Sequence, residues 1–251
     1  MRIAHILRTA TAAATIASIV VGGVAEANHV DEVHHYAAQS NSSLRFRGID
    51  GYVRVSGTVM QDPLTHFHAG FINLCQSASC TNWLQTGGIQ GTAGFGSEVI
   101  RSINLVHMYL ESTNGCGEYT NTDLGVPPSP NYPYYIYYSG VSETRDCGTQ
   151  RKFWFKVGSV NNPPSGFSWL STADGLAIAE QETTFFESVN TDWFGLDHNG
   201  TINDSFGLHL KNSSNQWVLW NAANAPGTIT GSNGSLVYVP KKAWSAFQAH
   251  D

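Results

Sequence analysis

The chain has 251 residues, of which 41% are hydrophobic and only 13% are charged, and its formal net charge is −6. This length and apolar content are enough for a sizeable core, in one all-β domain or two small domains. The acidic balance and the lack of a basic cluster argue against a nucleic-acid or anionic-membrane partner. Low charge with 25 glycines favours an exported β-protein over a cytosolic helical one.

Residues 1–27 have the features of a secretory signal peptide. Arg2 and Arg8 precede an apolar run over residues 10–24, which ends in the small-x-small cleavage pattern AEA. A membrane anchor is the alternative, but the run is short for a bilayer span, and no later stretch reaches about 18 uninterrupted apolar residues. We therefore expect a secreted protein that has no membrane contact once the signal peptide is removed.

The remaining chain is expected to be a flexible extension over residues 28–43, which are polar and lack a clear period, followed by one domain over residues 44–251. Short alternating or β-branched runs separated by turn residues predict an all-β sandwich or jelly roll, which we expect to be a monomer. Loops are expected at 92–97 and 112–133, and a short helical turn at 241–250. Strands are predicted at residues 52–59, 66–74, 83–90, 104–111, 134–138, 152–157, 175–183, 205–210, 216–220 and 235–239.

The four cysteines all follow the signal peptide, and an even number in an oxidising compartment predicts two disulfides. Three pairings are open. Cys75 and Cys80 flank a short hairpin-like loop, which favours a 75–80 bridge and leaves Cys116 to pair with Cys147. A zinc site built from all four cysteines is the alternative, although the chain has no CxxC spacing.

Two stretches carry candidate catalytic side chains. Residues two apart on a strand share a face, so Gln85 is expected beside Trp83, and Glu180 beside Glu182, at about 7 Å. Burial and mutual repulsion are expected to raise the pKa of at least one of these two carboxyl groups. Such a carboxyl can take a proton from water, and an amide such as Gln85 can donate a hydrogen bond to an oxyanion. Solvent-facing positions without a catalytic role are the alternative for both residues.

Five runs occur in a defined order: GIDGYVRVSGTV at 48–59, HAGFINLC at 68–75, WLQTG at 83–87, YLE at 109–111 and DGLAIAE at 174–180. In this order they resemble the secreted glutamic peptidases of the eqolisin type, and related bacterial proteins. Gln85 falls on the glutamine of the family's LQTG run, and Glu180 falls on its catalytic glutamate. The family's run VGIDG reads INLCQ here, at residues 72–76, so the family's aspartate is missing and Cys75 stands at its position.

The resemblance implies a concanavalin-like sandwich of two curved antiparallel sheets, with a groove on the concave face. It implies an acid-active endopeptidase in which Glu180 activates water and later protonates the leaving amine. Gln85 would polarise the scissile carbonyl and stabilise the tetrahedral intermediate. The partner would be a polypeptide substrate, and no cofactor is implied. The candidate substrate-binding residues are Phe71, at the position of the family's groove tryptophan, with Trp83, Tyr109, Glu111 and Glu182.

Two other function classes stay open. A jelly-roll glycosidase would use Glu111 and Glu180 as an acid/base pair across a groove. A non-catalytic carbohydrate- or surface-binding module would need only a groove lined by aromatic rings. The aromatic residues for such a groove are Tyr132, Tyr134, Tyr135, Tyr137, Tyr138, Trp154 and Phe155.

Three histidines are candidate metal ligands. His66 and His68 would share a strand face, and His107 could lie nearby. No further ligand with a recognisable spacing accompanies them, so we expect satisfied or exposed histidines and no bound metal.

Overall fold

A computed structural model describes residues 31–40, 43–55, 67–95, 98–114, 116–129, 131–159, 161–188, 201–221, 227–232, 237–241 and 246–250. The expected signal peptide lies outside these described residues. Within them, regular structure is all strand apart from one 3-10 turn at Ala173–Gly175. No helix in the described part of the chain has the length and hydropathy needed to span a bilayer.

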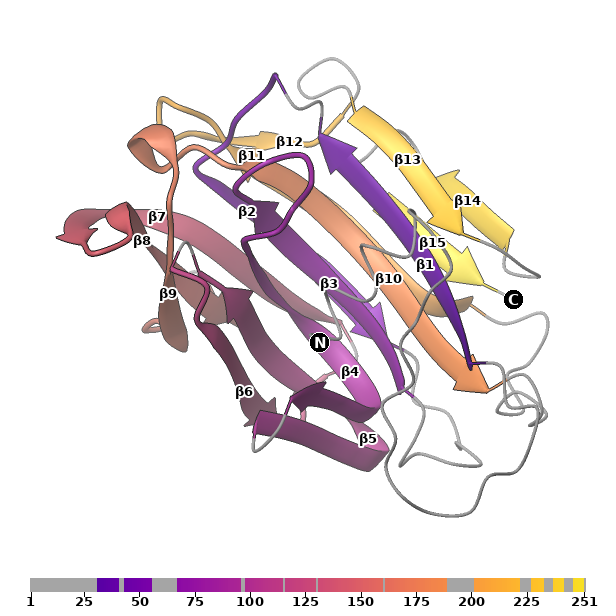
Figure 1. Ribbon diagram of the computed structural model, residues 1–251. Coiled ribbons are helices and arrows are strands. Elements are labelled where there is room, and N and C mark those ends of the chain that lie inside the picture. Colours follow the sequence, from indigo (N-terminus) through magenta and orange to yellow (C-terminus); the bar gives the residue numbers. More distant parts are fainter. Residues whose placement is uncertain are drawn as a thin grey trace.

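The strands form two antiparallel sheets that pack face to face (Figure 1). One sheet has seven strands: β1 (Asp31–Ser40), β3 (Phe67–Cys75), β4 (Trp83–Phe95), β5 (Glu98–Thr113), β6 (Tyr119–Gly125), β10 (Ile178–Ser188) and β13 (Gly227–Ser232). Their order across the sheet is β13-β1-β10-β3-β4-β5-β6. The predicted all-β sandwich of two antiparallel sheets is therefore confirmed.

The second sheet has eight strands in the order β14-β15-β11-β2-β7-β8-β9, and the short β12 pairs with β11. Strands that are distant in sequence lie side by side in both sheets, so the contacts that build this fold are mostly long-range. The bounds are β2 (Gly48–Val55), β7 (Tyr132–Arg145), β8 (Gly148–Val157), β9 (Gly166–Leu170), β11 (Thr201–Lys211), β12 (Trp217–Leu219), β14 (Val237–Lys241) and β15 (Ala246–His250).

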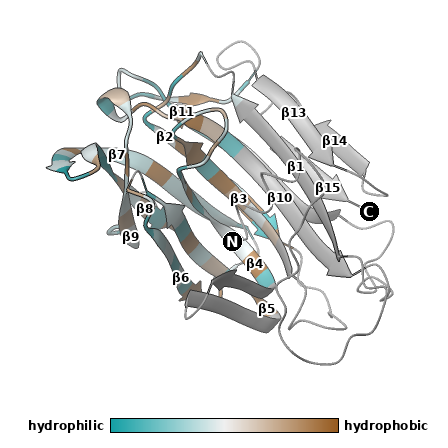
Figure 2. Ribbon diagram, viewed as in Figure 1, coloured by the Kyte–Doolittle hydropathy of each residue, from teal (hydrophilic) through white to brown (hydrophobic). Residues whose placement is uncertain are grey.

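Alternating side chains fill the space between the sheets. Ile49 and Val53 of β2 pack in the same buried cluster as Ile72 and Leu74 of β3, and Figure 2 shows hydrophilic residues interrupting the hydrophobic ones along these strands. Burying each such side chain stabilises the fold by about 1.5–3 kcal/mol. The opposite face of each strand is left for polar or functional residues.

The predicted flexible extension over residues 28–43 is wrong for residues 31–40. They form β1, which lies between β10 and β13 and pairs with both in antiparallel register. This segment lacks the alternation that marks a half-buried strand. It can still join a sheet because backbone hydrogen bonds to two neighbours, rather than a side-chain pattern, hold a central strand in place.

Three further predictions about loops and turns are corrected. β4 continues through the glycine-rich run to Phe95, where it pairs with the start of β5. The segment 112–133 contains β6, an edge strand paired with β5. The tail holds β15, paired with β11 and β14, in place of the expected helical turn. In each case pairing with a distant or following strand overrides weak local propensity.

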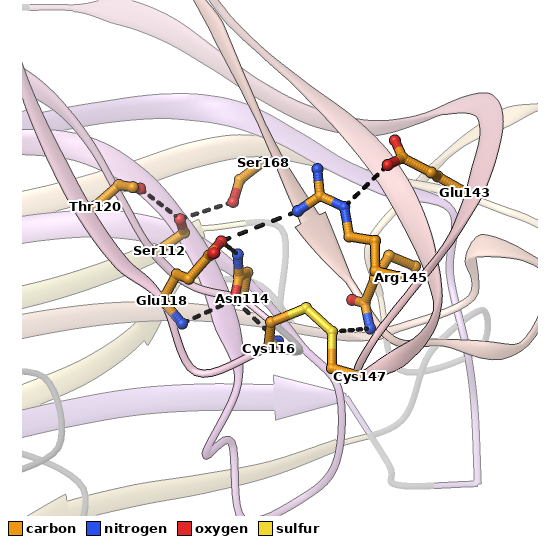
Figure 3. Close-up of polar contacts among 10 residues, drawn as sticks. Ser112, Asn114, Cys116, Glu118, Thr120, Glu143, Arg145, Cys147 and Ser168 are labelled. Atoms are coloured by element: carbon orange, nitrogen blue, oxygen red, sulfur yellow. Dashed lines mark hydrogen bonds and ion pairs between the residues drawn. A yellow bond between two sulfur atoms is a disulfide. The ribbon is translucent and has the colours of Figure 1, made fainter.

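Both predicted disulfides are confirmed. Cys75–Cys80 closes the turn between β3 and β4, and Cys116–Cys147 connects the β5–β6 turn of one sheet to the β7–β8 turn of the other. Beside the second bridge, Arg145 lies 3.4 Å from Glu143 and 4.0 Å from Glu118 (Figure 3). All four cysteines of the chain are used in this way, so the alternative zinc site of four thiolates is excluded.

Candidate active site

A row of polar side chains crosses the seven-stranded sheet. Glu180 on β10 is opposite Asn73 on β3, and Asn73 is opposite Gln85 on β4. Gln85 is opposite Glu111 on β5, which is opposite Asn121 on β6. Directly opposed residues of antiparallel strands project on the same face. We call these five residues the polar row, and it brings Gln85 and Glu180 onto one face with a single strand between them.

The polar row lies on the face of its sheet that points away from the core. Leu74 and Leu84, which precede or follow members of the row along β3 and β4, belong to the core between the sheets. Asn121 at the edge is half-buried, but the other four members are buried, with Asn73 0%, Gln85 3% and Glu180 5% exposed. Buried polar groups need hydrogen-bond partners, so the contacts within this row decide its chemistry.

Glu180 lies between an amide and a disulfide. Its Oε2 accepts a hydrogen bond from Asn73 Nδ2 at 3.2 Å and lies 3.1 Å from Cys75 Sγ. A disulfide sulfur carries no proton, so Cys75 cannot donate a hydrogen bond to the Glu180 carboxylate. Cys75, Cys80 and Glu180 place three potential ligand atoms within 4.8 Å of one another. The sulfurs are bonded to each other, however, and offer no thiolate to a metal.

The side-chain amide of Gln85 is oriented by two neighbours. Its Nε2 donates to a carboxylate oxygen of Glu111 and to the Tyr109 hydroxyl at 3.2 Å. The other oxygen of Glu111 accepts a hydrogen bond from the Tyr119 hydroxyl. Because a carboxylate only accepts, Glu111 holds the NH₂ group of Gln85 on its own side. The carbonyl oxygen of Gln85 is buried without a hydrogen-bond partner, as is Oδ1 of Asn73.

Phe71 and Tyr109 lie on either side of Gly87 in the next row of the same face. Their ring centroids are 6.4 Å apart in an edge-to-face contact, and both rings are buried. The contact depends on Gly87, because an added Cβ would lie 2.0 Å from the backbone oxygen of Gly70. Glu182 is opposite Phe71 in register, but its side chain lies outside the described residues.

Trp83 occupies the third row of this face and is fully buried. It packs in a small cluster with the Cys75–Cys80 disulfide and Ile178, against which Tyr119 also packs. Trp83 therefore lies beside the polar row on the same face, next to the disulfide that contacts Glu180. Its predicted role in substrate binding stays a prediction.

The three histidines are not brought together as a described site. His66 lies outside the described residues. His68 on β3 is opposite Gln90, and its side chain is not described. His107 Nδ1 lies 2.8 Å from a carboxylate oxygen of Asp123, on the exposed edge formed by β5 and β6.

Three members of the site, Asn73, Tyr119 and Asn121, were not predicted from the sequence. A signal for Asn73 was present, since it lies within the run at residues 68–75 that carries part of the resemblance, two residues before Cys75 on the same strand. Tyr119 gave no comparable signal, because it belongs to β6, which was expected to be a loop.

Among solved structures, two of scytalido-glutamic peptidase are similar to this chain. The structure with a transition state analog inhibitor has a TM-score of 0.46 and 8% sequence identity, and the match covers 89% of this chain and 99% of that one. The structure with a peptide-based transition state analog has a TM-score of 0.42 and 9% identity, with the same coverage. No family model matches the chain, and no curated protein matches it.

Proposed function

We propose that this chain is an exported, acid-active endopeptidase that uses Glu180 as general base and Gln85 as the amide that stabilises the oxyanion. The polar row is the observation that carries the proposal, because it sets Glu180, Asn73 and Gln85 in adjacent positions on one face. The backbones of Gln85 and Glu180 are two strand spacings apart, about 10 Å. Asn73 stands between them and contacts Glu180 at 3.2 Å, so in the proposed reaction this amide moves aside to admit the scissile peptide bond.

In the proposed reaction, Glu180 takes a proton from a water molecule as the water oxygen attacks the carbonyl carbon of the scissile peptide bond. Gln85 donates an N–H to the carbonyl oxygen as it becomes negatively charged, in place of its present hydrogen bond to Tyr109. Glu180 then gives its proton to the leaving nitrogen, the C–N bond breaks, and a carboxylic acid and an amine are released.

The surroundings of Gln85 support this role. Glu111 and Tyr109 fix its amide group, and Tyr119 in turn fixes Glu111. An amide held in place before the reaction costs little reorganisation when charge develops, and burial strengthens its hydrogen bond. The unpartnered carbonyl oxygens of Gln85 and Asn73 are acceptors that a water proton or a substrate N–H could meet.

The glycosidase alternative is not favoured by the same row. Glu111 and Glu180 are separated by three strand spacings, about 14 Å between backbones, and the side chains of Asn73 and Gln85 stand between them. Paired glycosidase carboxyls work at about 5 to 9.5 Å with the sugar between them. The arrangement therefore fits a carboxyl working with an amide better than a pair of carboxyls.

The export part of the proposal is supported by the two disulfides, which persist in oxidising compartments. A polypeptide is the proposed substrate because the pairing of a carboxyl with an amide suits attack on a carbonyl whose leaving group is protonated by the same carboxyl.

Digestion of an unfolded protein between pH 3 and pH 5 tests the proposal, with new amino termini counted over time. Glu180→Gln and Gln85→Ala are expected to lose cleavage while keeping the wild-type unfolding transition. The matched controls are Glu143→Gln and Gln216→Ala, exposed residues outside the site, which should cleave as the wild type does. Robust cleavage by folded Glu180→Gln would rule out the proposed mechanism.

A further inference from the structure

The outer face of the eight-stranded sheet carries a second cross-strand row, made of aromatic rings and cations. The register runs without interruption from β12 through β11, β2, β7 and β8 to β9. Its members share one face because they oppose one another in antiparallel strands. We call it the aromatic row: Trp217, Lys211, Gly48, Tyr137, Trp154 and Phe167.

The aromatic row faces away from the core. Ile49, Ile136 and Phe153, which alternate with its members along β2, β7 and β8, are core residues. Phe167, at one end, is 53% exposed. The polar row lies on the outward face of the other sheet, so the sandwich separates the two features. Several tyrosines considered from the sequence as groove residues, including Tyr134, point into the core instead.

Lysine side chains lie over the rings of this row. Lys152 Nζ is 4.2 Å from the centroid of Trp154 and 3.9 Å from that of Phe167. Lys211 Nζ is 5.1 Å from the ring of Tyr137 and 5.8 Å from that of Trp217. Cation–π contacts of this kind restrain a lysine that would otherwise be flexible. The restrained ammonium groups lose less conformational entropy when they bind an anion.

Gly48 makes the row continuous. A Cβ at this position would lie 2.8 Å from Tyr137 Cβ and 3.1 Å from Trp217 Cη2. The missing side chain thus leaves room for the Trp217 indole beside the Cβ of Tyr137. The Trp217 ring meets that of Tyr135 edge to face, with centroids 6.5 Å apart.

Positive charge is concentrated at the Trp217 end of the row. Burial lowers the pKa of Lys211, and the positive charge of nearby Arg47 lowers it further. The Nε of Arg47 is buried and has no hydrogen-bond partner. Two cations side by side, one with an unused donor, form a site that an anionic group would stabilise. This positive region stands out in a chain of net charge −6.

We propose that the aromatic row binds a linear acidic polysaccharide that carries carboxylate groups at regular intervals. Lys211 on β11 and Lys152 on β8 are three strand spacings apart, about 14 Å, so a polymer with regularly repeated anions can pair with both. The ring of Phe167 is 53% exposed and offers apolar contact on the parts that Lys152 does not cover, and the Tyr137 hydroxyl offers a hydrogen bond. The proposal does not depend on peptidase activity, because the two rows lie on different sheets.

Single-stranded nucleic acid fits the row less well. Its binding relies on bases stacking on free ring faces. Here the ammonium group of Lys152 lies over the rings of Trp154 and Phe167. These two rings also meet edge to face at 83°, which presents no pair of parallel faces to successive bases.

Affinity electrophoresis in native gels tests the proposal, with polygalacturonate as the acidic polymer and dextran as the neutral one. The wild type is expected to be retarded by polygalacturonate alone. The double variant Lys152→Gln/Lys211→Gln should bind about tenfold more weakly, and Lys152→Arg/Lys211→Arg should restore binding because it keeps both charges. Arg45→Gln removes one exposed cation outside the row and should bind as the wild type does.

Equal retardation by dextran, or wild-type affinity in the folded Gln double variant, would overturn the proposal. So would tighter binding of a single-stranded DNA oligomer than of polygalacturonate, measured by fluorescence anisotropy. Glu180→Gln separates this surface from the proposed peptidase: it should bind polygalacturonate as the wild type does whether or not cleavage is lost. Loss of binding in that variant, with folding intact, would show that the aromatic row is not the site.

Discussion

Asn73 donates a hydrogen bond from Nδ2 to Oε2 of Glu180 at 3.2 Å, between strands β3 and β10. The same residue is opposite Gln85 on its other side. Asn73 therefore occupies the position between the two proposed catalytic groups. Its amide both restrains the carboxyl and fills part of the space that a water molecule and a scissile carbonyl would use.

Replacing this amide tests whether it restrains the proposed reaction. Asn73→Gly is expected to raise the rate of acid proteolysis about tenfold, since it removes one hydrogen bond of about 1.4 kcal/mol from the base and opens the row. It should also lower the free energy of unfolding by about 1 kcal/mol, the usual cost of glycine within a strand. Initial rates at pH 4 and urea unfolding measure the two effects.

The comparison variant is Asn73→Asp, which keeps the size of the side chain but puts a second carboxyl beside Glu180. It should be slower than wild type, because like charges disfavour the ionised base. If Asn73→Gly and Asn73→Asp both cleaved at the wild-type rate, the amide would have no part in the reaction.

Glu111 is expected to act by positioning Gln85. Glu111→Gln replaces a charge-assisted hydrogen bond with a neutral one and no longer forces the NH₂ group of Gln85 toward β5. We expect kcat to fall about 10- to 100-fold with little change in KM, as for a donor that acts on the transition state. Tyr119→Phe removes only the hydroxyl that supports Glu111 and should cause a smaller loss. A rise in KM with unchanged kcat would assign Glu111 to substrate binding instead.

The sequence predicted the chemistry of single strands better than their arrangement. Alternation put Gln85 and Glu180 each on a definite strand face, and the short Cys75–Cys80 loop indicated the disulfide pairing. The sequence did not show that β10 pairs with β3. Asn73 and Glu180 are 107 residues apart, and strand order depends on long-range packing. Asn73 was not predicted as a site residue for this reason, because its role depends on the residues opposite it on the neighbouring strands.

Burial of the polar row was equally hidden. Gln85, Glu111 and Glu180 alternate with core leucines and alanines, a pattern that normally predicts solvent-facing polar side chains. Similarly, the polar sequence of β1 resembles a loop until its two neighbouring strands are known. The local hydrophobic pattern predicts the strand face on which a residue lies. Whether that face is buried depends on how distant segments of the chain pack against it.

The two disulfides are expected to differ in their contribution to stability. The Cys116–Cys147 bridge spans 31 residues and joins the two sheets, so the loop-closure model gives it about 4 kcal/mol, against about 2 kcal/mol for Cys75–Cys80, which spans 5. Denaturant unfolding of Cys116→Ala/Cys147→Ala and of Cys75→Ala/Cys80→Ala measures both. The second pair contacts Glu180, so it should alter the pH profile of cleavage, and the first should not. A larger loss of stability from the 75–80 pair would show that packing around Trp83 outweighs loop closure.

Asp50 on β2 is expected to make stability fall as pH rises. Burial raises the pKa of Asp50 from 3.8 to about 6, against the opposing effect of His209, whose Nδ1 lies 2.9 Å from its carboxylate. The folded state therefore binds a proton that the unfolded state has released between these two values. This contribution to stability is present below about pH 4 and is lost as pH rises through about 6.

Asp50→Asn removes this titration while keeping the shape of the side chain. Its free energy of unfolding, measured in urea from pH 4 to pH 7, should decline less with pH than that of the wild type, and titrating groups that do not contact Asp50 cancel in the comparison. His209→Gln is the informative control: it removes the group that lowers the Asp50 pKa, so the decline should shift to higher pH. Parallel curves for wild type and Asp50→Asn would mean that the folded protein does not hold this proton, and that Asp50 and His209 form an ion pair throughout the range.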